Sequence, residues 1–168
     1  TSATGTLYYY CIATYNSGGC TTATSNIAQV VVNPIQTITT QPLVTQDICI
    51  GGTIPALTVA YTGGVGTATY QWYSNSTNTN SGGLLISGAT LSSYTPSVFT
   101  TAGDYYYYAT VTLSGSGCNS VSSTTALVHV VADPTVSITP SSQTICQGTT
   151  PTDLVVTPSG GVGTYSYQ

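Results

Sequence analysis

The sequence predicts an all-β fold built from β-sandwich domains, and three observations support this prediction. Tyr, Thr, Val and Ile are abundant, and these residues fit the pleated, half-buried surface of a sheet. Lys, Arg, Glu and Met are missing from the 168 residues, so most strong helix formers are absent. Alternating apolar and small polar residues recur between clusters of Gly, Pro, Asn and Ser, which is typical of short strands joined by turns.

The chain is almost free of charge. Charged residues make up 2% of it, whereas soluble domains carry roughly 25%. Without cations we expect no nucleic-acid partner and no binding to anionic membranes. The longest apolar runs, AQVVV and ALVHVV, are far shorter than the roughly 20 residues of a spanning helix, so no membrane insertion is expected. A neutral surface without trypsin sites suits a protein exposed outside the cell.

Two pairs of stretches match at a nearly constant spacing. GTLYYYCIATYNSGGC at 5–20 aligns with GDYYYYATVTLSGSGC at 103–118, an offset of 103 − 5 = 98. Cys49 and Cys146 lie 146 − 49 = 97 residues apart, and so do the two GGVGT motifs. A period of this size corresponds to one β-sandwich domain and exceeds a solenoid unit. The sequence therefore predicts tandem repeats of about 98 residues.

Proline after Asn33 and after Asp133 ends a strand and marks a domain boundary. We expect the C-terminal part of one domain in residues 1–33, a complete domain in 34–132 and the N-terminal part of a third in 133–168. Neither partial unit has enough strands to bury a core alone, so the natural protein is expected to be longer at both ends. Completion by strand donation between copies is less favoured, because the two pieces together lack a central segment.

The complete domain contains about seven strand signals, each bounded by turn residues. A break at Pro42 interrupts the first segment, a Gly-Gly turn precedes the second strand, and GGVG and SGSG form later turns. The expected strands are 35–40 (A), a short run to 48, 56–61 (B), 68–74 (C), 84–86, 91–95, 103–113 (F) and 122–131 (G). Seven strands in about 98 residues predict an immunoglobulin-like (Ig-like) sandwich.

Trp72 in strand C and AGDYYYY at the start of strand F resemble the W…D-x-G-x-Y-x-C frame of immunoglobulin domains. The string YQWYSN…GG…ISGAT…SYTP…TAGDYYYY…SGC is similar to Ig-like repeats of giant SprB-like cell-surface adhesins of gliding Bacteroidota, which are exported by type IX secretion. The resemblance covers the whole chain. It implies an extracellular, adhesive and structural role at the cell surface, with no enzymatic site in the repeat.

The run of four tyrosines should divide between the two faces of strand F, because side chains alternate along a strand. Tyr105 and Tyr107 are expected in the core near Trp72, with Tyr105 at the tyrosine-corner position. Tyr106 and Tyr108 are expected on the outer face.

Together with Tyr73, the outward tyrosines Tyr106 and Tyr108 would form a stripe of rings. The stripe has two interpretations. It could stiffen the sheet by cross-strand packing, or it could form a surface-binding platform on which sugar rings stack.

Residues that could carry chemistry are sparse. His129 is the only imidazole and aligns with Gln29 at the offset shared by the prolines, 129 − 29 = 100, which indicates a solvated strand position. No Ser-His-Asp set is credible from it. The four acids, Asp47, Asp104, Asp133 and Asp153, appear scattered, and a calcium site needs several nearby oxygen ligands. We therefore expect no enzyme, no metal and no cofactor.

Five cysteines are disulfide candidates. Cys49 and Cys118 could pair within the domain. However, the A–B and F–G turns that hold them lie at opposite ends of a sandwich, roughly 30 Å apart, and a disulfide needs Cα atoms within about 7 Å. The alternative is that Cys49 pairs with the F–G cysteine of the following domain. Cys20 and Cys146 are the matching residues in the partial units. Cys11 lies where immunoglobulin domains keep their core cysteine, and its partner would precede the sequence.

Two functions follow from these observations. The first is a stalk segment of a large secreted cell-surface adhesin, for surface attachment or gliding motility. Its expected partners are the neighbouring repeats and surface glycans or abiotic surfaces. The alternative is a carbohydrate-binding module of a secreted multidomain enzyme. An exposed flat patch of tyrosines would favour the alternative.

Overall fold

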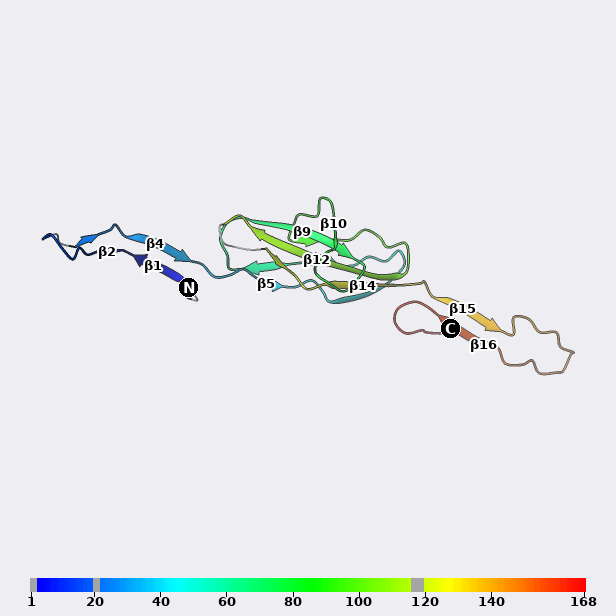
Figure 1. Ribbon diagram of the computed structural model, residues 1–168. Helices are drawn as coiled ribbons and strands as arrows, with labels where there is room; N and C mark the ends of the chain where they lie inside the picture. The colour runs from blue at the N-terminus through cyan, green and yellow to red at the C-terminus, as the bar shows by residue number, and fades with distance from the viewer. Residues whose placement is uncertain (1–2, 20–21, 116–119) are drawn as a thin grey trace.

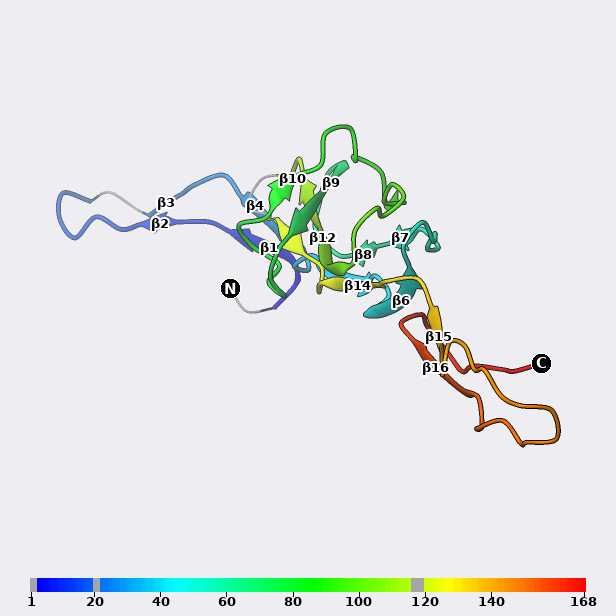
Figure 2. The same ribbon diagram turned by 90° about the vertical axis from the view of Figure 1, so that its right-hand side faces the viewer.

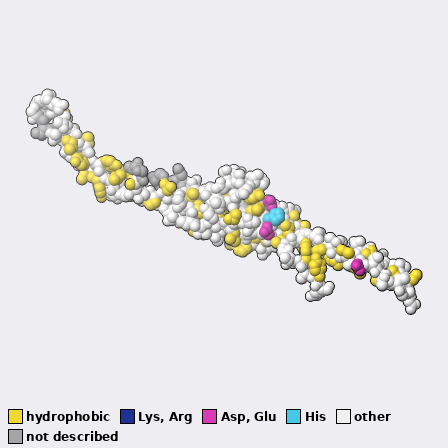
Figure 3. Space-filling model, turned by 90° about the horizontal axis from the view of Figure 1, so that it is seen from below, with side chains coloured by type: hydrophobic (Ala, Val, Ile, Leu, Met, Phe, Trp, Pro, Cys, Tyr) yellow, Lys and Arg dark blue, Asp and Glu magenta, His cyan; other side chains and the backbone are white. Residues whose placement is uncertain are grey.

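The protein is all-β, and its strands form a central sandwich with a hairpin at each end (Figure 1). The computed structural model describes residues 3–19, 22–115 and 120–168. Within these ranges there is no helix, and so none that could cross a membrane. The two hairpins extend from opposite ends of the sandwich, which makes the molecule elongated (Figures 1 and 3).

The N-terminal hairpin contains two antiparallel pairs. β1 (Gly5–Tyr9) pairs with β4 (Ala28–Val32). Further toward the tip, β2 (Ile12–Ala13) pairs with β3 (Ala23–Thr24).

The C-terminal hairpin pairs β15 (Thr135–Thr139) with β16 (Val155–Ser159). The backbone N–H of Gly161 donates to the carbonyl of Ala132 at 2.9 Å. This bond ties the hairpin to the end of the central sandwich.

One layer of the sandwich is a sheet with the strand order β10-β9-β12-β14-β6, to which β13 adds beside β12 (Figure 2). Its strands are β6 (Thr45–Cys49), β9 (Ala68–Asn75), β10 (Leu84–Leu85), β12 (Gly103–Leu113), β13 (Val121–Ser122) and β14 (Ala126–Val131). The order β10-β9-β12-β14 corresponds to C′-C-F-G of an Ig-like sandwich.

The second layer consists of two short pairs. β5 (Thr37–Thr40) pairs with β8 (Ala60–Thr62), and β7 (Leu57–Thr58) pairs with β11 (Ser93–Tyr94). These correspond to strands A, B and E, and β7 and β8 are two halves of strand B.

Alternating side chains from both layers meet in one core. The buried cluster comprises Ile54, Leu57, Val59, Trp72, Phe99, Tyr107, Ala109, Val111, Ala126, Val128 and Val130. Because β12 and β14 contribute every second residue to this cluster, their remaining side chains form the outer face of the large sheet.

The first predicted strand divides between the two layers. β5 belongs to the small layer, whereas β6 crosses to the large sheet and runs parallel to β14. Buried Pro42 lies between them, where a residue without an N–H donor ends the first pairing. Two backbone bonds flank the parallel ladder: Leu127 N–H to Val44 O at 2.8 Å and Ile50 N–H to Val131 O at 3.1 Å.

The N-terminal hairpin and the β12–β14 hairpin share one register. Gly5 pairs with Val32, and Gly103 pairs with Val130, so both residues shift by 98 (103 − 5 and 130 − 32). The β2–β3 pairs equal the β12–β13 pairs at the same offset.

Both hairpins also contain the same side-chain bond, in which a serine hydroxyl interrupts the ladder. Ser25 Oγ accepts from the N–H of Cys11 at 2.8 Å, and Ser123 Oγ accepts from the N–H of Ala109 at 3.0 Å.

Candidate functional site

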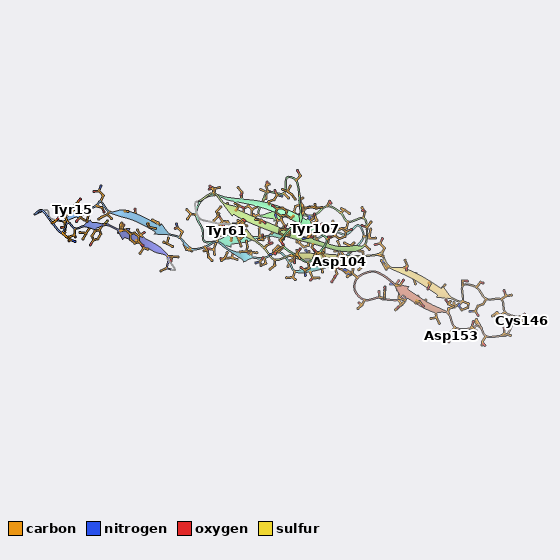
Figure 4. All side chains as sticks on the ribbon, viewed as in Figure 1. Tyr15, Tyr61, Asp104, Tyr107, Cys146 and Asp153 are labelled. Carbon is orange, nitrogen blue, oxygen red and sulfur yellow. The ribbon has the colours of Figure 1, made fainter. Side chains whose placement is uncertain are left out.

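The inner face of β12 is anchored by Trp72, which is fully buried. Its indole Nε1–H donates to the carbonyl of Leu91 at 2.9 Å, so the polar atom of this large side chain is satisfied. The ring of Tyr94 lies 5.9 Å from Trp72 and 5.9 Å from Tyr107, centroid to centroid. Tyr107, labelled in Figure 4, therefore belongs to the same core cluster as Trp72, with the ring of Tyr94 in contact with both. Burial, together with the nearby Tyr94 and Tyr105, raises the pKa of Tyr107 to about 12.

Tyr105 is half-buried at the edge of the same core. Its ring centroid lies 4.8 Å from that of Phe99. Its hydroxyl donates to the carbonyl of Thr101, four residues upstream, at 3.0 Å. A bond from this tyrosine back to upstream backbone is the tyrosine corner of Ig-like sandwiches.

Tyr108 lies on the outer face, as the alternation predicts, but only 4% of its surface is accessible. The loop of residues 76–83 covers it. The N–H of Gly83 donates to the Tyr108 hydroxyl at 3.1 Å. On the other side, Tyr73 stacks on Tyr108 with ring centroids 5.0 Å apart and ring planes 10° apart. A polar loop thus closes over an aromatic pair.

The covering loop is held by two asparagine amides, one at the end of β9 and one within the loop. Asn75 Nδ2 donates to the carbonyls of Thr79 at 3.0 Å and Ser81 at 3.2 Å. Asn80 Nδ2 reaches across to the carbonyl of Ser123 at 2.9 Å. The Asn80 bond links the loop across β12 to the residue that follows β13, so Tyr108 is covered by an anchored segment.

Tyr106 is the remaining member of the predicted stripe and is half-buried between its cross-strand neighbours Asn75 and Leu127. The stripe of Tyr73, Tyr106 and Tyr108 is therefore packed across strands and partly covered by the loop, and it is not an exposed flat patch. Sequence reasoning missed this because the loop's Asn, Ser, Thr and Gly residues indicate a solvated turn rather than a cover.

The structure brings together three ionisable side chains that lie far apart in the sequence. His129 Nδ1 lies 2.5 Å from Asp104 Oδ1, with the two side chains 46% and 47% exposed. Asp47 lies opposite His129 on the other neighbouring strand.

The register also corrects the alignment of His129 with Gln29. Tyr8 pairs with Gln29 as Tyr106 pairs with Leu127, so the structural counterpart of His129 is Val31. The two extra residues lie between Val130 and Pro134, at the end of β14 and just after it. The histidine therefore replaces an apolar residue, not a polar one.

The described cysteines, Cys11, Cys49 and Cys146, are free thiols. Cys20 and Cys118 lie outside the described residues, so neither candidate pairing of Cys49 is resolved. Cys146 is found in the distal part of the C-terminal hairpin (Figure 4).

Cys49 pairs with Val131 at one end of the large sheet. The described residues flanking Cys118, Gly115 and Val121, lie toward the opposite end, near Val65 and Val111.

Other features of the surface carry little chemistry. No group of three or more His, Cys, Asp or Glu in the described parts of the chain is placed to hold a metal ion. A shallow groove of about 410 Å³ is lined by hydroxyl and amide side chains of residues 78–81 and by Thr124 and Thr125.

The architecture is that of an all-β sandwich. Residues 39–132 match the family model described as "Domain of unknown function (DUF8696)", and the chain belongs to that family. The comparison with curated proteins finds no match.

Proposed function

We propose that this chain is a stalk segment of a large secreted cell-surface adhesin in which Ig-like domains repeat in tandem, as in the type IX secretion substrates that it resembles. The observation that carries the proposal is the common register of two hairpins 98 residues apart, β1–β4 and β12–β14. The serine bond that interrupts both ladders recurs at the same offset. The family match, 39–132, ends at the last residue of the domain predicted from the sequence, 34–132.

The placement of the two hairpins supports a stalk. The two hairpins leave the central sandwich at opposite ends (Figure 1). Only a few residues separate β4 from β5 and β14 from β15, so neighbouring domains have little freedom to fold back on one another. Domains joined in this way form an extended array.

The parallel pairing of β6 and β14 suits a module under tension. Tension pulls β6 from its N-terminal end and β14 from its C-terminal end. Because the strands are parallel neighbours, these opposed forces shear the ladder and load all its hydrogen bonds together. Separation then requires several bonds to break at once rather than one after another.

The composition of the chain, which has no Lys and no Arg and is rich in hydroxyl and amide side chains, supports a location outside the cell. Contacts made by hydroxyls and amides are nearly independent of ionic strength, because salt screens charges. The partners of the segment would be neighbouring repeats, with surface glycans or abiotic surfaces contacted elsewhere in the array. The carbohydrate-binding alternative loses support because loop 76–83 covers Tyr108.

The direct test is antibody labelling of intact cells that make the protein, with antibodies raised against residues 34–132. The proposal predicts surface labelling without permeabilisation. Labelling that appears only after permeabilisation would refute it.

A further inference from the structure

Asp104, His129 and Asp47 form one line across the outer face of the large sheet. His129 on β14 is the direct register partner of Asp104 on β12 and of Asp47 on β6. Figure 3 shows the imidazole between two carboxylates. Half of the acids of the chain and its only histidine thus meet on three adjacent strands.

The imidazolium is the only side-chain cation that this row can contain, because the chain has no Lys and no Arg. The Nδ1–Oδ1 contact with Asp104 is 2.5 Å. The other titratable side chains on this face of the neighbouring strands are diagonal neighbours, Tyr106 on β12 and Cys49 on β6. Neither carries a positive charge, so a proton on His129 decides whether the two carboxylates have a cationic partner.

The strand on the far side of the row is an edge strand. β6 pairs with β14 alone in the described part of the sheet, whereas β14 is held on both sides. A cross-strand pair of opposite charges stabilises neighbouring strands, and like charges destabilise them. We propose that the Asp104–His129–Asp47 row is a proton-dependent clamp that holds the edge strand β6 onto β14.

The direction of the pH dependence follows from the surroundings of His129. The hydrogen bond to Asp104, aided by the charges of Asp104 and Asp47, raises the pKa of His129 against a smaller opposing effect of burial. A folded-state pKa above the unfolded value means that protonation stabilises the fold. That stabilisation is complete below the ordinary histidine pKa of about 6.5 and is lost as the pH rises through the raised pKa. The clamp therefore weakens on the alkaline side.

The N-terminal hairpin provides an internal comparison. At the positions that correspond to Asp104 and His129 it has Thr6 and Val31, which pair in the same register. The N-terminal hairpin thus lacks both the acid and the histidine. It nevertheless has the same register, so the hairpin geometry forms without the clamp. The charged row is an addition in the central domain and is not a requirement of the β12–β14 hairpin.

The first test uses the single imidazole of the chain, whose NMR signal needs no assignment. The clamp predicts that Asp104→Asn and Asp47→Asn each lower the His129 pKa, whereas the matched control Asp153→Asn, a change in the C-terminal hairpin, leaves it unchanged. An unchanged pKa in Asp47→Asn would overturn the proposal, because β6 would then take no part in the row.

The second test is hydrogen exchange of the backbone amides of β6 in the 168-residue chain. After correction for intrinsic rates, protection of β6 should fall by about twofold to fivefold as His129 loses its proton, while β9 amides keep theirs. His129→Gln should remove the difference between the strands. If the protection of the β6 amides depended on pH in the His129→Gln variant as it does in the unmodified chain, the clamp proposal would be overturned.

Only one aspect of the clamp rests on the proposed function, namely that it would hold β6 in place when the chain is under tension. Both tests are made on the free chain and do not depend on whether the chain belongs to a surface stalk. Failure of cell labelling would leave these results standing, and their failure would leave the stalk untouched.

Discussion

The hydroxyl of Tyr108 accepts a hydrogen bond from the backbone N–H of Gly83, 3.1 Å away, and so fastens loop 76–83 over the outer face of the sheet. The ring below that hydroxyl stacks on Tyr73. An aromatic residue that the strand pattern assigns to solvent thus belongs to a second, smaller packed layer outside the main core.

This arrangement predicts that Tyr108 is a structural residue. Tyr108→Phe removes only the bond from Gly83 and should lower the free energy of unfolding by about 1 kcal/mol. Tyr108→Ser also removes the stacked ring and should cost about 3 kcal/mol. The measurement is the denaturant midpoint, with Tyr106→Ser as the matched control on the same face. A Tyr108→Ser loss no larger than that of Tyr106→Ser would contradict the account.

A second prediction concerns the parallel ladder. Ile50→Pro removes the N–H that donates to Val131 and should lower the unfolding force in single-molecule stretching, together with about 1–3 kcal/mol of stability. Val44→Pro is the control, because Val44 contributes a carbonyl to its bond with Leu127 and proline keeps that carbonyl. Equal forces for Ile50→Pro and the unmodified chain would show that the ladder does not bear the load.

The third prediction concerns Cys49. β12 runs for 11 residues between the end of the sheet near Cys49 and the end near Gly115, a span of about 37 Å. The three residues from Gly115 to Cys118 reach at most about 11 Å, so we expect no bridge between Cys49 and Cys118.

Peptide mapping under non-reducing conditions should therefore find no Cys49–Cys118 peptide in the oxidised chain. Pepsin is a suitable protease, because the chain has no Lys or Arg for trypsin. Detection of that cross-linked peptide would exclude Cys49 as a staple between domains.

The strands of the fold could be predicted from the sequence because their signals are local. Alternation between Gly and Pro turns located β9 and β12, and the Tyr105 corner followed from its place at the start of a strand. The parallel pairing of β6 with β14 could not be predicted, because residues about 80 apart form it and no local pattern specifies a partner.

The outer face was harder to predict than the core for the same reason. Burial of Tyr108 depends on a loop whose composition is that of a solvated turn. The contact between His129 and Asp104 depends on the strand register, and the proline spacing pointed to Gln29 instead of Val31 as the counterpart of His129. The sequence therefore predicts where the strands lie, but it does not predict which strands pair or in which register.

The most direct test of the stalk is small-angle X-ray scattering on a protein of three consecutive repeats. Sandwiches with strands of about 37 Å placed end to end form a rod of roughly 110 Å, with a radius of gyration of about 32 Å. A compact particle of about 300 residues would have a radius of gyration near 19 Å. The account predicts the larger value with a narrow range of shapes, and a value near the smaller one would contradict it.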